Sequence, residues 1–155
     1  MDERREFLRH TLATLAYRAA RAVTGAPEEF AGFDGAGRTP VQILAHMGDL
    51  FDWALSISRG EETWHSSEPL PWAEEKLRFF AALEAFDALL ASEELIQAPL
   101  ERLFQGPVAD ALTHTGQIAM LRRLAEYTKK DEDFFRASIA AGRVGVDQAA
   151  PIFEY

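Results

Sequence analysis

The sequence predicts an all-α protein, a four-helix bundle with additional short helices. Strong helix formers dominate, because the chain holds 26 Ala and 17 Leu but only 5 Val and 6 Ile. Apolar residues also recur with the period of an α-helix in four long stretches. With 155 residues, 48% of them hydrophobic, the chain is long enough for one domain spanning residues 1–155 with its own core.

The first helix is expected from about Asp2 to Val23. Its apolar stripe consists of Leu8, Leu12, Leu15, Ala19 and Ala22. Gly25 and Pro27 lie just beyond it and are typical of a helix end. The following AGFDGAG stretch, residues 31–37, contains neither GxxxxGK[ST] nor GxGxxG, so we interpret it as a connector and not as a phosphate-binding loop.

The second helix carries the clearest start signal. Thr39 is an expected N-cap, Pro40 suits the first helical position, and Gln42 stands where a capping box requires it. Ser58 is its expected end, with Gly60 closing it.

The remaining helices follow from the same signals. A third helix is expected to start at Pro71 and to run through Leu90, and a shorter piece is expected over residues 93–104. Gly106 and Pro107 are expected to open the last main helix, which reaches about Tyr127. A final short helix is expected around residues 131–140.

Charge and cysteine content exclude several classes of function. The formal net charge of -9, without a concentrated basic cluster in the sequence, disfavours binding to nucleic acid. The absence of Cys excludes disulfides, thiolate zinc sites and a thiol nucleophile from the chain itself. A metal would need His and carboxylate ligands. No leader or membrane-spanning run is recognisable, so we expect a cytoplasmic protein that does not bind membranes.

Polar residues interrupt the apolar stripe of the second helix. His46 stands between Ile43 and Leu50, where an apolar residue is expected, so it should point inward. Asp49 follows one turn later and could reach toward His46 or share its cavity.

The last helix shows the same anomaly more strongly. Asp110, His114 and Gln117 continue into Leu121 and Leu124 on one stripe. A carboxylate on an inward face needs a partner, and a divalent cation would provide one. The i, i+4 spacing of Asp110 and His114 is also the spacing by which helical HExxH motifs present two ligands to zinc.

A simpler interpretation remains open at this point. Asp110 and His114 could form a hydrogen-bonded pair, with His46 an ordinary core histidine. His10 on the flank of the first helix and His65 in a polar loop are poor ligand candidates. Two arginines, Arg122 and Arg123, follow the stripe; one could anchor an anionic substrate, although the simpler interpretation is that both are surface residues.

Two segments, TPVQILAHMGDLFDW and DALTHTGQIAMLRRL, resemble the DinB/YfiT-like family of metal-binding four-helix bundles. The resemblance covers most of the chain, including FFRASIAAGRVGVDQAAP near its end. It implies that His46, Asp110 and His114 hold one divalent metal, with Gln117 completing the xGQ signature after the last ligand. It also implies a homodimer.

Asp110 departs from the family pattern, which most often has His at this position, or Glu in thiol-dependent isomerases. Zinc or nickel is the expected metal, and manganese or iron is also compatible with a carboxylate ligand.

Three protein ligands would leave coordination positions open for water or a substrate. The leading hypothesis is a metal-dependent enzyme acting on a small molecule. It would be a hydrolase or an S-transferase that uses a low-molecular-weight thiol such as mycothiol, bacillithiol or glutathione. Asp49 and Gln117 would orient the ligands or a bound water. The alternatives are a non-catalytic dimeric bundle acting through protein interaction and a non-haem iron enzyme that uses oxygen. The sequence assigns no general acid or base.

Overall fold

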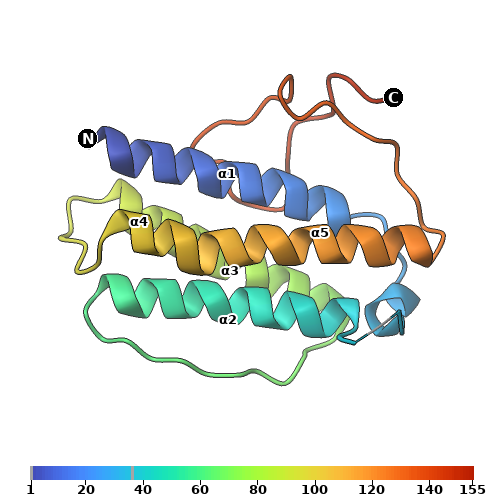
Figure 1. Ribbon diagram of the computed structural model, residues 1–155, viewed down its shortest axis with the longest axis horizontal. Coiled ribbons are helices and arrows are strands. Elements are labelled where there is room, and N and C mark those ends of the chain that lie inside the picture. Colours follow the sequence, from blue (N-terminus) through green and yellow to red (C-terminus); the bar gives the residue numbers. More distant parts are fainter. Residues whose placement is uncertain (1, 36) are drawn as a thin grey trace.

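The computed structural model describes residues 2–35 and 37–155, and this part of the chain contains helices and no strand. The long helices are α1 (Glu3–Val23), α2 (Pro40–Ser58), α3 (Trp72–Ala91) and α5 (Ala109–Leu124). α2 packs against α3 and α5, and α1 packs against the same two helices, so the four form a bundle (Figure 1). The prediction of an all-α bundle is confirmed.

The predicted helix starts coincide with observed caps. The Asp2 side chain accepts a hydrogen bond from the Arg4 amide at the start of α1. At the start of α2, Thr39 and Gln42 form the predicted capping box. Gly60 follows α2 with a φ of 77°, a conformation that glycine adopts without strain.

The core lies between the four long helices. It is dominated by aromatic and long aliphatic side chains that are fully buried. These are Phe30, Phe51, Phe79, Phe86, Leu12, Leu15, Leu44, Met47, Leu83, Leu90, Leu103 and Ile118. Their burial stabilises each helix through tertiary packing, by roughly 1.5–3 kcal/mol per large side chain.

The connector after α1 contains a short element that the sequence analysis did not predict. Residues Glu28–Gly32 form a 3-10 helix. Its Phe30 is fully buried and meets Trp72 edge to face, with ring centroids 5.8 Å apart. The expected connector over residues 31–37 therefore begins inside this helix, and its Ala36 lies outside the described residues.

The start of the last main helix was predicted incorrectly. α4 (Leu100–Leu103) continues through a π-helical turn (Phe104–Val108) directly into α5, so the helical path begins after Pro99. Pro107 has no N–H to donate, but the Ala109 N–H reaches back five residues to the carbonyl of Phe104 and carries the helix past the proline. Residues 93–99 are not helical, contrary to the prediction for 93–104.

Arg122, interpreted from sequence as a surface residue, is in fact buried. Its guanidinium Nη1 donates to the carbonyls of Ala22 and Thr24 at distances of 2.9 and 2.7 Å, and its Nε donates to the carbonyl of Tyr127 at 2.7 Å. The carbonyls at a helix C-terminus lack partners within the helix, so Arg122 satisfies and electrostatically complements the end of α1. α5 ends at Leu124, short of the predicted Tyr127.

The final short helix predicted around residues 131–140 does not form. The backbone there bonds to the end of the chain instead, since the Asp133 N–H donates to the Phe153 carbonyl. The Asp133 carboxylate also accepts from the Phe135 amide, a local bond that favours a turn over a helix. The segment after α5 runs over α1 (Figure 1), where the Tyr17 hydroxyl donates to the Glu132 carboxylate.

The helices of the described residues include none with the length and hydropathy that a membrane span requires.

Candidate metal centre

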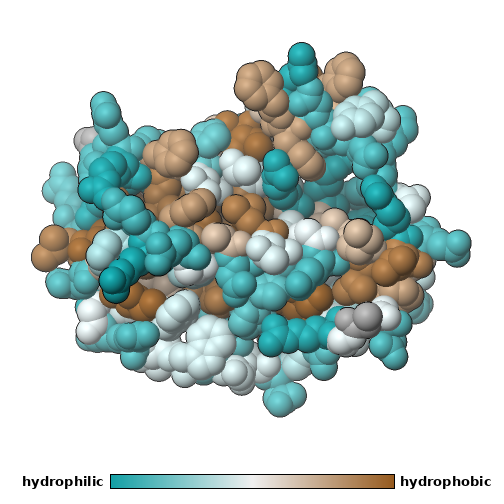
Figure 2. Space-filling view, viewed as in Figure 1, coloured by the Kyte–Doolittle hydropathy of each residue, from teal (hydrophilic) through white to brown (hydrophobic). Residues whose placement is uncertain are grey.

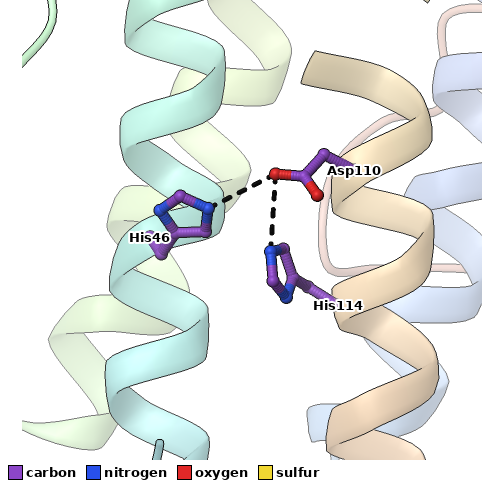
Figure 3. A group of neighbouring side chains, drawn as sticks. All are labelled: His46, Asp110 and His114. Atoms are coloured by element: carbon purple, nitrogen blue, oxygen red, sulfur yellow. Dashed lines mark hydrogen bonds and ion pairs between the residues drawn. The ribbon is translucent and has the colours of Figure 1, made fainter. Parts of the chain in front are cut away.

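The structure brings His46, Asp110 and His114 together, and we call these three residues the ligand cluster (Figure 3). His46 comes from α2, and the other two come from successive turns of α5. The Asp110 Oδ2 lies 3.4 Å from the His46 Nε2 and also 3.4 Å from the His114 Nε2. The two imidazole rings are perpendicular, with centroids 4.8 Å apart. Three potential donor atoms therefore converge on one point between α2 and α5.

The spacing within the ligand cluster suits a shared metal ion, and the contact between His46 and Asp110 also meets the distance limit of a long hydrogen bond. A charge-assisted N–H···O bond has an N···O distance of about 2.7–2.9 Å. Tetrahedral donors bound to zinc at about 2.0–2.1 Å lie about 3.3–3.4 Å from one another. The two observed distances of 3.4 Å match the second case, and two imidazoles with one carboxylate form a suitable donor set for a divalent ion.

The ligand cluster opens to solvent on the Asp110 side. The side chain of Asp110 is 46% exposed, compared with 21% for His46 and 13% for His114. The sequence argument that Asp110 needs a cation because it is buried is therefore wrong. Burial lowers the pKa of His46, and electrostatic interactions with His114 and Arg38 lower it further against the opposing effect of Asp110. His46 is thus favoured in the neutral form that a metal requires.

Gln117 contacts the ligand cluster directly. Its side-chain Oε1 lies 2.7 Å from the Nδ1 of His114, one turn earlier on α5. With the Gln117 amide in this orientation, its oxygen accepts and the Nδ1 of His114 donates. In the neutral imidazole the Nε2 is then the unprotonated nitrogen on the side of Asp110, which is the tautomer that a histidine binding metal through Nε2 needs.

Asp49, predicted to act near His46, is directed toward other residues. Its carboxylate accepts hydrogen bonds from the amide and the hydroxyl of Ser67, at 2.8 and 2.7 Å. The His65 Nε2 lies 3.2 Å from Asp49 and 3.3 Å from Asp52. His65, a poor ligand candidate by sequence, therefore joins Asp49 and Asp52 of α2 in a second group of possible metal-binding side chains.

A guanidinium already occupies this second group. Arg78 of α3 pairs with both Asp49 and Asp52, and its Nη1 lies 2.7 Å from the buried Glu75. We call Asp49, Asp52, His65 and Arg78 the Arg78 cluster. Burial alone would raise the pKa of Asp49, but the bonds from Ser67 and Arg78 outweigh it and hold that pKa below its usual value. The Arg78 cluster thus contains its own cation.

Close approach of Arg78 to α2 requires a glycine. The Arg78 Nη1 donates to the carbonyl of Ala45 at 3.1 Å. A Cβ at Gly48 would lie 2.8 Å from that same nitrogen, so any larger residue there would displace the guanidinium.

The Arg78 cluster also positions the segment that covers one side of the ligand cluster. Ser67 and His65 tie the segment between α2 and α3 to Asp49, and Trp64 lies in this segment. The Trp64 ring packs edge to face on His46, with centroids 5.7 Å apart, and on Trp53 at 5.8 Å. The contacts of Asp49 are therefore with the segment that carries Trp64, and it is Trp64 that packs on His46.

Two hollows flank the ligand cluster along the groove between α2 and α5. One, of about 700 Å³, is lined by Arg38, His114, Gln117, Met120 and Leu124 among others. The other, of about 450 Å³, is lined by Trp53, Asp110 and their neighbours. Figure 2 shows an apolar patch over the C-terminal end of α5, where the side chains of Met120 and Leu124 are more than half exposed. A small molecule could therefore reach the ligand cluster from solvent.

No protein-family model, no curated protein and no solved structure matches this chain.

Proposed function

We propose that this protein binds one divalent metal ion through His46, Asp110 and His114, and that the metal-bound protein is an enzyme acting on a small molecule in the α2–α5 groove. The observation that carries the proposal is the pair of 3.4 Å separations from Asp110 to the two histidines. Zinc or nickel is the proposed ion, with manganese and iron as alternatives. The resemblance to the DinB/YfiT-like family is part of this proposal and agrees with the same three residues.

A divalent ion held by three protein ligands would supply Lewis acidity, lowering the pKa of a water or thiol that enters the site. We propose either hydrolysis or S-transfer from a low-molecular-weight thiol. The chain contributes orientation: Gln117 fixes the proton of His114 on Nδ1, and Trp64 shields one side of His46. Arg38 lines the adjacent hollow, where it could attract an anionic group of a substrate.

Metal binding is tested first. Untagged protein is stripped with a chelator, dialysed against zinc, nickel, manganese or anaerobic ferrous iron, and analysed for bound metal. We expect one ion per chain in the wild type and loss of binding in His114→Ala. His10→Ala removes an exposed histidine outside the ligand cluster and is the matched control. A wild-type chain that binds none of the four metals would refute the proposal.

Catalysis is tested separately, with the metal-loaded protein and a panel of esters and thiol–electrophile pairs. We expect turnover that His114→Ala abolishes and His10→Ala leaves unchanged. Metal binding without turnover of any substrate would favour the non-catalytic bundle instead.

A second candidate function comes from the ligand set itself. Two histidines and one carboxylate with open positions are typical of non-haem iron(II) oxygenases. Oxygen consumption by the iron-loaded wild type, absent from the zinc-loaded form, would favour this candidate over the hydrolase and the S-transferase.

A further inference from the structure

A third cavity lies on the other side of α5, between α5, α1 and the chain that follows α5. Its volume is about 680 Å³. Thr115, Ala119 and Arg122 line it, whereas His114 and Gln117 of the metal centre do not. At 3.6 residues per turn, the two sets lie on opposite sides of the helix. The cavity is therefore separate from the ligand cluster.

The wall of this cavity is basic, although the formal net charge of the whole chain is -9. Six of the 16 Lys and Arg residues line it, against two acidic residues. The basic residues are Arg18, Arg21, Arg122, Arg123, Lys129 and Lys130. Positive charge concentrated in a cavity attracts anions and is stabilised by binding them.

The acidic residues near the cavity are already paired with two of the arginines. Arg21 lies 3.2 Å from Glu132 and 3.1 Å from Glu154. Arg123 lies 3.1 Å from Asp131. These pairs leave the other four basic side chains without a carboxylate partner among the described residues.

The four remaining cations contact neutral groups or solvent. Arg122 gives its hydrogen bonds to main-chain carbonyls, and Arg18 lies over the Phe134 ring, 4.1 Å from its centroid. Lys129 and Lys130 are exposed and form no ion pair with a described residue. Their ammonium groups are therefore available to a ligand.

The surroundings of Lys129 are unfavourable for a lone positive charge. Although Lys129 is exposed, partial desolvation by the surrounding side chains lowers its pKa, and the neighbouring guanidinium groups of Arg122 and Arg21 lower it further. An anion bound among these three side chains would favour the charged form of Lys129 and so raise its pKa again.

We propose that this cavity binds the phosphate group of a small phosphorylated molecule. A phosphate presents several acceptor oxygens and up to two negative charges, which suits ammonium groups beside guanidinium groups. The volume exceeds that of a phosphate ion and falls in the range of small-molecule sites. The proposal does not depend on the proposed metal-dependent function.

Calorimetric titration of metal-stripped protein with pyrophosphate at constant ionic strength tests the proposal. We expect saturable binding at one site per chain. The double variant Lys129→Gln/Lys130→Gln should weaken it by about tenfold or more, because it removes two charge-assisted contacts. Both lysines are exposed, so the variant is expected to fold. The charge-matched control is Arg59→Gln/Arg102→Gln, at two exposed positions outside the cavity lining.

Three outcomes would overturn the proposal. One is absence of pyrophosphate binding to the wild type. Another is an equal loss in the Arg59/Arg102 control, which would show that only overall charge matters. A third is loss of binding in His114→Ala, which would place the ligand at the metal centre. Vesicles of phosphatidylcholine with phosphatidic acid present the same phosphate chemistry on a surface, and binding to vesicles but not to pyrophosphate would exclude a small soluble ligand.

Discussion

Two groups of acidic and histidine side chains share helix α2, and they differ in the source of their positive charge. The Arg78 cluster contains a guanidinium that pairs with Asp49 and Asp52. The ligand cluster has no Arg or Lys partner for Asp110 among the described residues. The side chain of Asp49 is 4% exposed and that of Asp110 is 46% exposed. Proximity of His and Asp side chains alone therefore does not identify a metal site, because an arginine of the chain can supply the positive charge that a metal ion would otherwise supply.

The largest expected effect is on the Arg78 cluster. Arg78→Ala should lower the free energy of unfolding by about 3 kcal/mol or more, because it leaves Asp49 and Glu75 buried without their cation. Urea denaturation of the metal-free protein measures this change. Arg59→Ala, at an exposed position, should change the stability by less than about 0.5 kcal/mol. If both variants were equally stable, Arg78 would not be needed as the cation of the Arg78 cluster, and the proposed difference between the two clusters would be wrong.

The next effect concerns the ligand cluster. At a free zinc concentration of roughly one hundred times Kd, the wild type should gain about 2.7 kcal/mol of stability, because only the folded chain assembles the three ligands. His114→Ala should gain nothing. His65→Ala should keep the full gain, since His65 belongs to the Arg78 cluster. If zinc instead stabilised His114→Ala and not His65→Ala, the roles of the two clusters would be reversed.

A smaller effect is expected at Gln117. Gln117→Leu removes the acceptor that holds the proton of His114 on Nδ1. Loss of such a contact typically lowers metal affinity about 10–100-fold. Competition with a chelator of known affinity measures the change, and Gln97→Leu, at an exposed position between α3 and α4, is the control for loss of an amide. An unchanged affinity would mean that Gln117 does not orient His114.

The smallest effect is the pH dependence at Asp49. Its pKa in the folded protein is lowered, so its contribution is complete above the unfolded pKa of about 3.9 and is lost as the pH falls through the folded pKa. We expect Asp49→Asn to be less stable than the wild type by about 1 kcal/mol at pH 7. That difference should shrink in acid denaturation below about pH 4, and a difference that stayed constant would argue against the ionised hydrogen-bonded carboxylate.

The same two clusters show what the sequence could predict. Local patterns were sufficient for the capping box at Thr39 and for placing Asp110 and His114 on one face of a helix, because both depend on spacing along one helix. They were wrong about the burial of that face, since the side chain of Asp110 is 46% exposed and Leu124 is 59% exposed. A bundle of facing helices indicated only that a site would lie between helices. The grouping of His46 with Asp110 and His114 was what the family resemblance implied, and the structure brings these three residues together.

The partners of Asp49 were missed because they lie far away in the sequence. Ser67 is in an irregular segment, and Arg78 is on another helix. The sequence did contain a signal for an ion-pair network. Asp49 and Asp52 are three residues apart, and Glu75 and Arg78 have the same spacing.

The π-helical turn at Phe104–Val108 affects the direction in which the side chains of α5 point. That direction depends on the number of residues in the turn more than on their side chains. Each residue of an α-helix turns the chain by about 100°, and a π turn accommodates one extra residue. Deleting one residue from this turn would rotate the rest of α5 by about 100°. Asp110 and His114 would turn away from His46, and Arg122 would turn away from the end of α1. The ligand cluster should therefore tolerate many substitutions in this turn but no change in its length.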